Sequence, residues 1–424
     1  MTYKSFIRHL RSVSLFATVA ALAACTALDK TPDGDGTSAA PAVLRRAAVV
    51  ADEPSAMQAG SAILNEGGNA ADAATAMYFT LAVTYPVAAG IGGGGICLIR
   101  DAQANRVSEY DFPVASPHST GAFGLGANVG GFAALQAAFG KLAWRRDIVP
   151  AEKLAGLGYP ISDVLEARLI SSEKAIHLDA SLAGEFLDES GRLKPAGSVI
   201  VLPQLAETLA RIRTSGANGF VRGLVGARIL QYLRTQGETI EKSDLDQNRV
   251  TARQPGKLKV APGVIWIPDP LNGASTALSR ALESATAAVV TGAGSALDSG
   301  AIDDGSTTFA AVDPSGEAVA CAVSMNGAFG SGHTVPGTGV TLARAPVSGA
   351  NALSLLAPIL AADEAGNVRL IGGASGSDEA ENALANIVMR SGEARVESAG
   401  ARFPGSLNAI HCVDDGCKIV EHTE

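Results

Sequence analysis

Three hydroxyl side chains, Ser306, Thr307 and Thr308, follow Gly305 at the start of the apolar stretch "FAAV". A hydroxyl is a weak nucleophile at neutral pH and needs a base close by. Cutting the chain before such a residue frees an α-amino group on that residue. This amine has a pKa near neutrality, so it can accept the hydroxyl proton. The alternative is structural, because β-branched threonines are typical of strands. The residues alone leave both interpretations open.

Hydrophobic periodicity and turn residues predict the elements that position these hydroxyls. We expect helices at 54–68, 69–86, 202–216, 223–237 and 378–392, with Asn69 as the N-cap of the second. We expect strands at 47–52, 307–313, 317–325, 339–344 and 367–373, and a hairpin of 95–101 with 106–112. Strands near both ends, with mostly helical sequence between them, predict one mixed α/β domain built from non-contiguous chain halves.

The run "GIGGGG" at 90–95 matches the dinucleotide-binding pattern G-x-G-x-x-G. That site needs a strand before the glycines and a helix after them. Here a predicted helix and Pro86 come first and a predicted strand follows, so the pattern excludes a dinucleotide site. We expect a tight turn that lets backbone segments pack closely.

The composition excludes further classes of function. The 424 residues carry a formal net charge of -9, whereas nucleic-acid binding usually needs a basic face. The six histidines are scattered without metal-ligand spacing. The sequence therefore predicts no nucleic-acid partner, no metal and no organic cofactor.

The N-terminus has the pattern of a targeting segment. Basic residues precede the apolar run 12–24, which is about as long as a secretory h-region, and Cys25 follows "LAA". We predict a lipoprotein signal peptide at 1–24 and lipidation of Cys25; the alternative is an ordinary signal peptide with a chance cysteine. Residues 25–44, rich in Pro, Gly, Asp and Ser, are expected to form a flexible tether. This predicts a protein anchored by lipid to the periplasmic face of a bacterial membrane.

The other four cysteines fall into two pairs. Cys97 and Cys321 lie in apolar runs and are expected to be buried free thiols. Cys412 and Cys417 flank the turn-forming "DDG", which favours a short-loop disulfide in an oxidising compartment. A metal-binding pair is the alternative there, with His411 as the only nearby histidine.

Four segments together resemble the γ-glutamyltransferase (γ-glutamyltranspeptidase) family: 51–101, 129–165, 243–255 and 307–340. The resemblance implies the αββα four-layer sandwich of N-terminal-nucleophile hydrolases. It also implies a precursor that cuts itself into two subunits that stay together. Residues 45–305 would form a large-subunit-like region and 306–424 a small-subunit-like region, both within one αββα domain.

The resemblance also indicates which of the three hydroxyls would be the nucleophile. Family members read roughly T-T-H-[YF]-S-V-V-D, with the first threonine as nucleophile. Aligning Asp313 with the final aspartate, without a gap, places Ser306 on that position, which implies a cut between Gly305 and Ser306. A slip of one residue would make Thr307 the nucleophile, and a chain without a nucleophile is the third possibility.

Other site residues follow from the same resemblance. Ser324 and Asn326 in "SMNGAFGSG" match a hydroxyl and an amide near the nucleophile and the substrate. Ser354 matches one substrate-binding serine, while Leu355 replaces the next. Ser375 and Gly376 fall on the glycines whose backbone N–H groups hold the oxyanion.

Both charged anchors of the family's γ-glutamyl site are replaced. Pro113 stands where the family has the arginine that grips the substrate α-carboxylate. The region that carries an acid for the α-amino group reads Ala345–Val347. Arg344 is a candidate stand-in cation, or simply a surface arginine. The chain between 275 and 306 is also shorter than in typical members.

The resulting prediction is a γ-glutamyltransferase-like hydrolase. It would cut itself at Gly305–Ser306 and then hydrolyse or transfer a γ-glutamyl or related acyl group from a small-molecule amide through an acyl-enzyme. One variant is an amidase with an N-terminal serine and a different acyl group. The alternative is a catalytically degenerate member, acting as a lipid-anchored binding or structural lipoprotein.

Overall fold

A computed structural model describes residues 47–116, 122–247, 250–260, 263–269, 278–283, 305–346, 356–391, 405–413 and 416–421. These ranges belong to one compact unit of residues 44–424. The predictions for the signal peptide, the tether, Cys25, Val347 and Ser354 lie outside the described residues.

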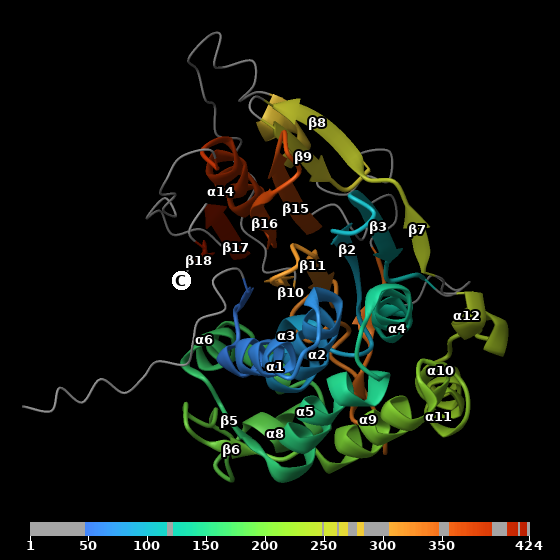
Figure 1. Ribbon diagram of the computed structural model, residues 1–424. Helices are drawn as coiled ribbons and strands as arrows, with labels where there is room; N and C mark the ends of the chain where they lie inside the picture. Colours follow the sequence, from blue (N-terminus) through green and yellow to red (C-terminus); the bar gives the residue numbers. More distant parts are fainter. Residues whose placement is uncertain are drawn as a thin grey trace, which may run out of the picture. The chain divides into compact units, whose positions relative to one another are not determined.

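Two antiparallel sheets, each with six strands within the described residues, form the centre of this unit (Figure 1). The first has the order β1 (Ala48–Ala51), β10 (Ser306–Val312), β11 (Ala318–Ser324), β2 (Gly94–Asp101), β3 (Arg106–Phe112) and β7 (Thr251–Arg253). The second has the order β18 (Gly416–Glu421), β17 (Ser406–Val413), β16 (Val368–Ser375), β15 (Leu356–Asp363), β9 (Gly263–Ile267) and β8 (Gly256–Val260).

The sheets pack face to face through apolar side chains of both, among them Val50, Leu98, Ala310, Leu360 and Ile371. Every residue of β10 and β11 is buried, so neither strand alternates between buried apolar and exposed polar residues. The chain halves before and after residue 305 thus share one sheet, as the sequence predicts.

Helices cover the outer face of each sheet. Against the second sheet pack α14 (Asp378–Met389) and a helical segment at 278–283. The helices on the side of the first sheet and beyond it are α1 (Pro54–Asn65), α2 (Ala70–Thr84), α3 (Pro86–Ala89), α4 (Asn128–Phe139), α5 (Trp144–Leu157), α6 (Asp163–Ser171), α7 (Glu173–Ile176), α8 (Ala180–Phe186), α9 (Pro203–Ser215), α10 (Asn218–Val221), α11 (Leu224–Thr235) and α12 (Lys242–Gln247). The layer order is helix, sheet, sheet, helix, as the resemblance implies.

Helix α2 lies between the first sheet and other helices and is buried along its whole length. Asn69 begins it with a capping box: its side chain accepts from the Asp72 N–H, and the Asp72 carboxylate accepts from the Asn69 N–H. None of the helices in the described part of the chain has both the length and the apolar character needed to cross a lipid bilayer.

Three short strand pairs complete the described fold: β4 (Phe123–Gly124) with β14 (Ala343–Arg344), β5 (Tyr159–Pro160) with β6 (Val199–Ile200), and β12 (Thr334–Val335) with β13 (Val340–Thr341). The predicted strand at 339–344 is thus split between two partners. The "GIGGGG" turn packs as expected: a Cβ on Gly93 would lie 2.6 Å from the Ser324 carbonyl oxygen.

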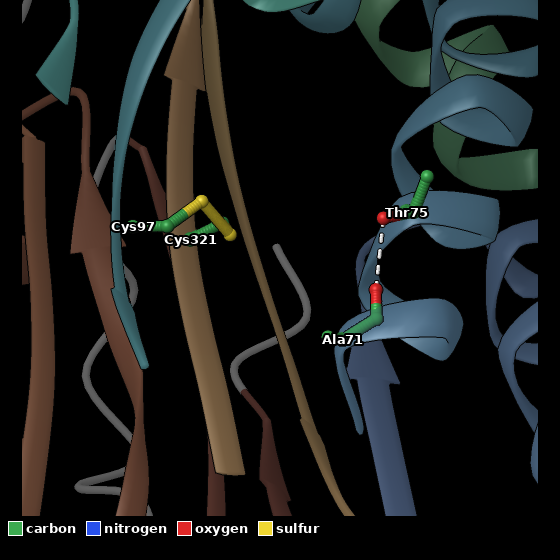
Figure 2. The surroundings of a disulfide bond; sticks show 4 residues. All are labelled: Ala71, Thr75, Cys97 and Cys321. Atoms are coloured by element: carbon green, nitrogen blue, oxygen red, sulfur yellow. Dashed lines mark hydrogen bonds between the residues drawn. A yellow bond between two sulfur atoms is a disulfide. The ribbon is translucent and has the colours of Figure 1, made fainter. Parts of the chain in front are cut away.

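The prediction of free thiols at Cys97 and Cys321 was wrong. The two residues are directly opposite each other on β2 and β11 and form a disulfide. Figure 2 shows it on the side of the sheet that faces α2. Each cysteine by itself has the apolar setting of a free thiol, and only the pairing of the strands brings them together. Cys412 and Cys417 form a second disulfide across the β17–β18 hairpin.

Candidate active site

Strand β10 places Ser306 at its first position, paired with Ser324 of β11. Ser306 is 1% exposed, and its hydroxyl makes no hydrogen bond to any residue that the structure describes. Burying a hydroxyl without a partner is costly, so such a group calls for an explanation, and a catalytic role is one.

The neighbouring hydroxyls are both engaged. Thr307 Oγ1 donates to Asp52 Oδ2 at 2.6 Å. Thr308 Oγ1 donates to the Gly373 carbonyl oxygen at 3.2 Å and lies 3.0 Å from Ser406 Oγ. These hydrogen bonds give both threonines a structural role. Of the three hydroxyls, only that of Ser306 has no hydrogen-bond partner among the described residues.

A polar network that the sequence did not predict lies beside Ser306. Asp52 directly follows β1, and its Oδ1 accepts from Asn408 Nδ2 on β17 at 2.7 Å. Asn408 Nδ2 also donates to the Thr308 carbonyl oxygen at 2.9 Å. Asp52 therefore ties the first sheet to the second next to the candidate nucleophile. The sequence signal that could have indicated this network is an acidic residue, Asp52, directly after a strand with buried residues.

Gly305 occupies a position that admits no side chain. Its φ is +64°, and a Cβ there would lie 2.1 Å from the Gly327 carbonyl oxygen. The Gly305 carbonyl oxygen accepts from the Met325 N–H at 3.0 Å and from the Ser324 hydroxyl at 3.4 Å. Two donors therefore polarise the carbonyl of the peptide bond that links Gly305 to Ser306.

Ser324 and Asn326 lie where β11 ends and turns. Asn326 has a φ of 57° and donates its N–H to Ser324 Oγ at 2.8 Å. This bond orients the Ser324 hydroxyl, which in turn donates to Gly305. The Asn326 side chain donates to the Arg344 carbonyl oxygen at 3.2 Å. The structure therefore brings both predicted residues to the end of the sheet where Ser306 lies.

Ser375 ends β16, and Gly376 follows it with a φ of 89°. Thr308 contacts Gly373 across the two sheets, and residues two apart on a strand share a face. Ser306 is two residues before Thr308, and Ser375 is two residues after Gly373. Both serines therefore lie toward the same end of the sandwich. The Ser375 hydroxyl is also buried without a partner among the described residues. The oxyanion role of Ser375 and Gly376 remains a prediction.

The described residues of the two segments with predicted anchor replacements, Pro113–Val114 and Ala345–Pro346, lie near the end of the first sheet that carries Ser306. A Cβ on Gly94 would lie 2.4 Å from the Val114 nitrogen, and Gly94 pairs with Ser324, the partner of Ser306. Val114 packs on Gly124 of β4, which is paired with β14. The segment after β3 and the segment that begins with β14 are therefore neighbours beside the candidate nucleophile, and they are the two segments where the resemblance implies that charged anchors are replaced.

A cavity of about 220 Å³ lies elsewhere, at the opposite end of β10 beside Val312 and Asp313. Its arginines are already paired: Arg100 donates to the carbonyl oxygens of Gly316 and Gly366, and Arg369 forms an ion pair with Asp363. Because the cavity lies at the end of β10 opposite Ser306, it is separate from the candidate active site. The described residues contain no cluster of three metal-ligating side chains.

Relatives of known sequence match this chain in part. The family model described as gamma-glutamyltranspeptidase matches residues 56–287, more than half of the chain. Glutathione hydrolase proenzyme of Escherichia coli (strain K12) is 31% identical over 238 residues, covering 51% of this chain and 40% of that protein. Glutathione hydrolase 2 of Arabidopsis thaliana is 31% identical over 224 residues, covering 49% and 38%. The chain thus spans about two fifths of the length of these curated relatives.

Solved structures support the fold. Cephalosporin acylase from Bacillus halodurans aligns with a TM-score of 0.71 over 90% of this chain and 94% of that chain, at 19% identity. Helicobacter pylori gamma-glutamyltranspeptidase aligns with a TM-score of 0.52 over 58% and 77%, at 28% identity. The fold is the αββα sandwich of N-terminal-nucleophile hydrolases, and the chain belongs to the γ-glutamyltranspeptidase family.

Proposed function

We propose that the protein is an N-terminal-nucleophile amide hydrolase or acyltransferase that activates itself by cutting the bond between Gly305 and Ser306. The observation that carries this proposal is the geometry of that bond. A buried, unpaired hydroxyl stands on one side of it, and a carbonyl with two hydrogen-bond donors stands on the other.

The cut would proceed in two steps. Ser306 Oγ attacks the Gly305 carbonyl carbon, while the Met325 N–H and the Ser324 hydroxyl stabilise the oxyanion. The C–N bond breaks, the nitrogen takes the hydroxyl proton, and an ester joins Gly305 to Ser306 Oγ. Water then hydrolyses this ester, which leaves a carboxylate on Gly305 and a free α-amino group on Ser306.

The freed amine would serve as the base for the substrate reaction. It accepts the Ser306 hydroxyl proton as Oγ attacks the amide carbonyl of the substrate, and it returns a proton to the leaving amine. Ser375 and Gly376 are the proposed oxyanion donors of this step, and Ser324, Asn326 and Ser354 are proposed to contact the substrate. Water or an amine then takes the acyl group from Ser306.

We propose the predicted location as well. The basic and apolar N-terminal segment and Cys25 support export and lipid anchoring at the periplasmic face of a bacterial membrane. The lost anchors support the alternative of a non-catalytic lipoprotein, because an unmodified γ-glutamyl group would find neither of its charged partners there.

Whether the chain is cut between Gly305 and Ser306 distinguishes these two functions. We expect a folded, aged sample to give two chains on a denaturing gel with reductant, one ending at Gly305 and one beginning at Ser306. With a γ-glutamyl anilide and a panel of other amides, the cut protein should release amine. A single uncut chain in such a sample would contradict the catalytic function and favour the lipoprotein alternative.

A further inference from the structure

We propose that the Cys97–Cys321 disulfide joins the two products of the cut covalently, so that the processed protein unfolds and refolds as one molecule in an oxidising compartment. The inference rests on the proposed cut between Gly305 and Ser306. It gives this disulfide a role that begins when the peptide bond is broken.

The position of the cut relative to the cysteines decides what each disulfide can join. Cys97 lies before Gly305 and Cys321 lies after it, so the cut falls inside the loop of chain that their disulfide closes. Cutting therefore turns a cross-link within one chain into a link between two chains. Cys412 and Cys417 both lie after the cut, so their disulfide cannot join the products.

Non-covalent contacts also join the two products while the fold is intact. The strand pairs that cross the cut are β1 with β10, β2 with β11, β4 with β14 and β9 with β15. The apolar layer between the sheets likewise contains side chains from both products, such as Leu98 and Ala310. The folded protein therefore needs no disulfide to stay together. All these contacts are lost on unfolding, and the covalent link then decides whether the products separate.

The disulfide connects two residues that are directly opposite each other in the sheet. Cys97 of β2 pairs with Cys321 of β11, and β11 also pairs with β10, which begins at Ser306. In an unfolded but linked protein, β2 and β11 stay joined at their native point of contact. Each product then meets the other at an effective concentration on the order of 1 mM. Products without the link must meet by diffusion, so their refolding depends on protein concentration.

The fold protects this disulfide. Cys97 and Cys321 are each 0% exposed, and their disulfide lies on the side of the sheet that faces α2 (Figure 2). A thiolate must reach a disulfide sulfur to reduce it, so burial blocks the exchange. Cys417 of the other disulfide is partly exposed. We therefore expect the link between the products to be lost only when the fold opens and a reductant is present.

The order of events follows from the same burial. An oxidant can reach Cys97 and Cys321 only before the sheet and α2 enclose them. The cut needs the finished sheet, because the donors to the Gly305 carbonyl oxygen are the Ser324 hydroxyl and the Met325 N–H at the end of β11. The disulfide thus forms first and the cut follows, so the products are joined from the moment they arise.

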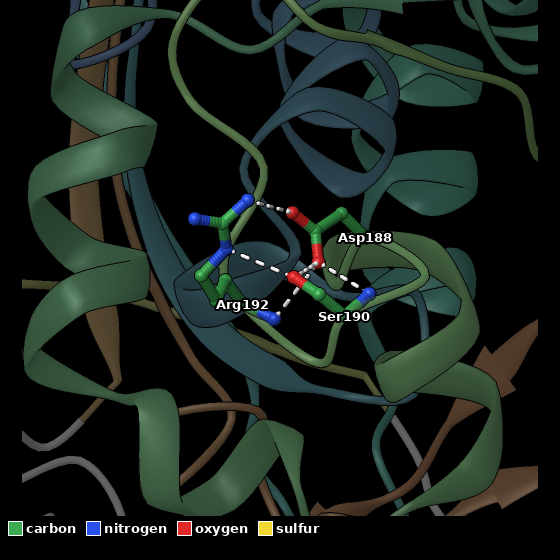
Figure 3. Close-up of polar contacts among 3 residues, drawn as sticks. All are labelled: Asp188, Ser190 and Arg192. Atoms are coloured by element: carbon green, nitrogen blue, oxygen red, sulfur yellow. Dashed lines mark hydrogen bonds and ion pairs between the residues drawn. The ribbon is translucent and has the colours of Figure 1, made fainter.

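A polar turn at the surface supplies a control for substitution as such. Figure 3 shows Asp188 accepting from the Ser190 hydroxyl at 2.6 Å and from the Arg192 guanidinium at 3.2 Å. These contacts lie within one turn of the chain before the cut, so they cannot join the products. Arg192→Ala should leave both the linkage of the products and their refolding unchanged.

Denaturing gels with and without reductant, after free thiols are blocked with an alkylating agent, test the link. We expect the cut wild-type protein to give one species without reductant and two with it. In the Cys97→Ala, Cys321→Ala double variant, the two chains should separate without reductant. The matched control is Cys412→Ala, Cys417→Ala, which removes the other disulfide and should leave the products linked.

Refolding tests the consequence of the link. The cut protein is unfolded in denaturant without reductant and then diluted, and circular dichroism follows the recovery. The wild-type rate should stay constant when the protein concentration is lowered from about 100 µM to about 1 µM, whereas the rate of the Cys97→Ala, Cys321→Ala variant should fall about 100-fold. The Cys412→Ala, Cys417→Ala variant should refold like the wild type.

The possible failures are distinguishable. A digest analysed without reductant should contain a peptide pair joined through Cys97 and Cys321, whether or not the chain is cut. Absence of this pair, two wild-type chains without reductant, or wild-type refolding that slows on dilution would overturn the inference. These wild-type measurements decide it even if the double variant does not fold. A single chain in the presence of reductant would contradict the cut, and with it the proposed function.

Discussion

Replacing Ser306 with alanine is expected to leave the chain uncut and to lower amide hydrolysis by at least about a thousandfold. The variant keeps the strand, because Ser306 is buried and its hydroxyl bonds to no described residue. It loses only the nucleophile. Reducing gels follow the cut, thermal unfolding checks the fold, and the amide that the wild type hydrolyses fastest measures the rate.

Two further variants test the assignment of this hydroxyl. Ser306→Thr keeps a hydroxyl and is expected to cut. Thr307→Val loses the bond to Asp52, costs about 1 kcal/mol of stability and still cuts. Cutting that persists in Ser306→Ala, or that is lost in a folded Thr307→Val, would move the nucleophile away from Ser306.

The free energy of unfolding is expected to fall as the pH rises from about 5 to about 8.5. Burial raises the pKa of Asp147 to about 8 and the pKa values of Glu53, Glu185 and Glu317 to about 7. In the unfolded chain such carboxyls titrate near pH 4. The folded state therefore holds more protons between these values. Its added stability is complete below about pH 4 and is lost as the pH passes 7 to 8.

Asp147 should carry a large share of this loss. Both of its carboxylate oxygens are buried without a partner among the described residues, and the nearby charge of Asp72 adds to the effect of burial. Asp147→Asn should come closest to the wild type near pH 4, where the carboxyl is still partly protonated in the unfolded chain, and exceed its stability by about 1–3 kcal/mol near pH 8.5. The exposed Asp163→Asn serves as control. Denaturant unfolding at both pH values that shows equal differences would contradict the buried carboxyl.

Local sequence signals predicted the elements around the site. The strand predicted at 307–313 and the N-cap predicted at Asn69 depend on neighbouring residues, and the structure has them as β10 (Ser306–Val312) and the cap of α2. The order of elements around the glycine run at 90–95 was also predicted correctly, with a helix before it and a strand after it, because such an order depends on local sequence.

Contacts between segments that are distant in the sequence could not be predicted from local sequence patterns. The disulfide of Cys97 with Cys321 joins residues 224 apart and depends on strand register. The bond of Asp52 to Asn408 links the two sheets. Arg344 was a candidate cation from its type alone, and only the pairing of β4 with β14 places it beside Gly327.

Mass spectrometry of the purified, reduced protein shows whether the chain is cut between Gly305 and Ser306. We expect a C-terminal chain whose first residue is Ser306, with a free α-amino group, and a partner chain that ends at Gly305. A single chain that contains an intact Gly305–Ser306 bond, or a new terminus at Thr307, would contradict it.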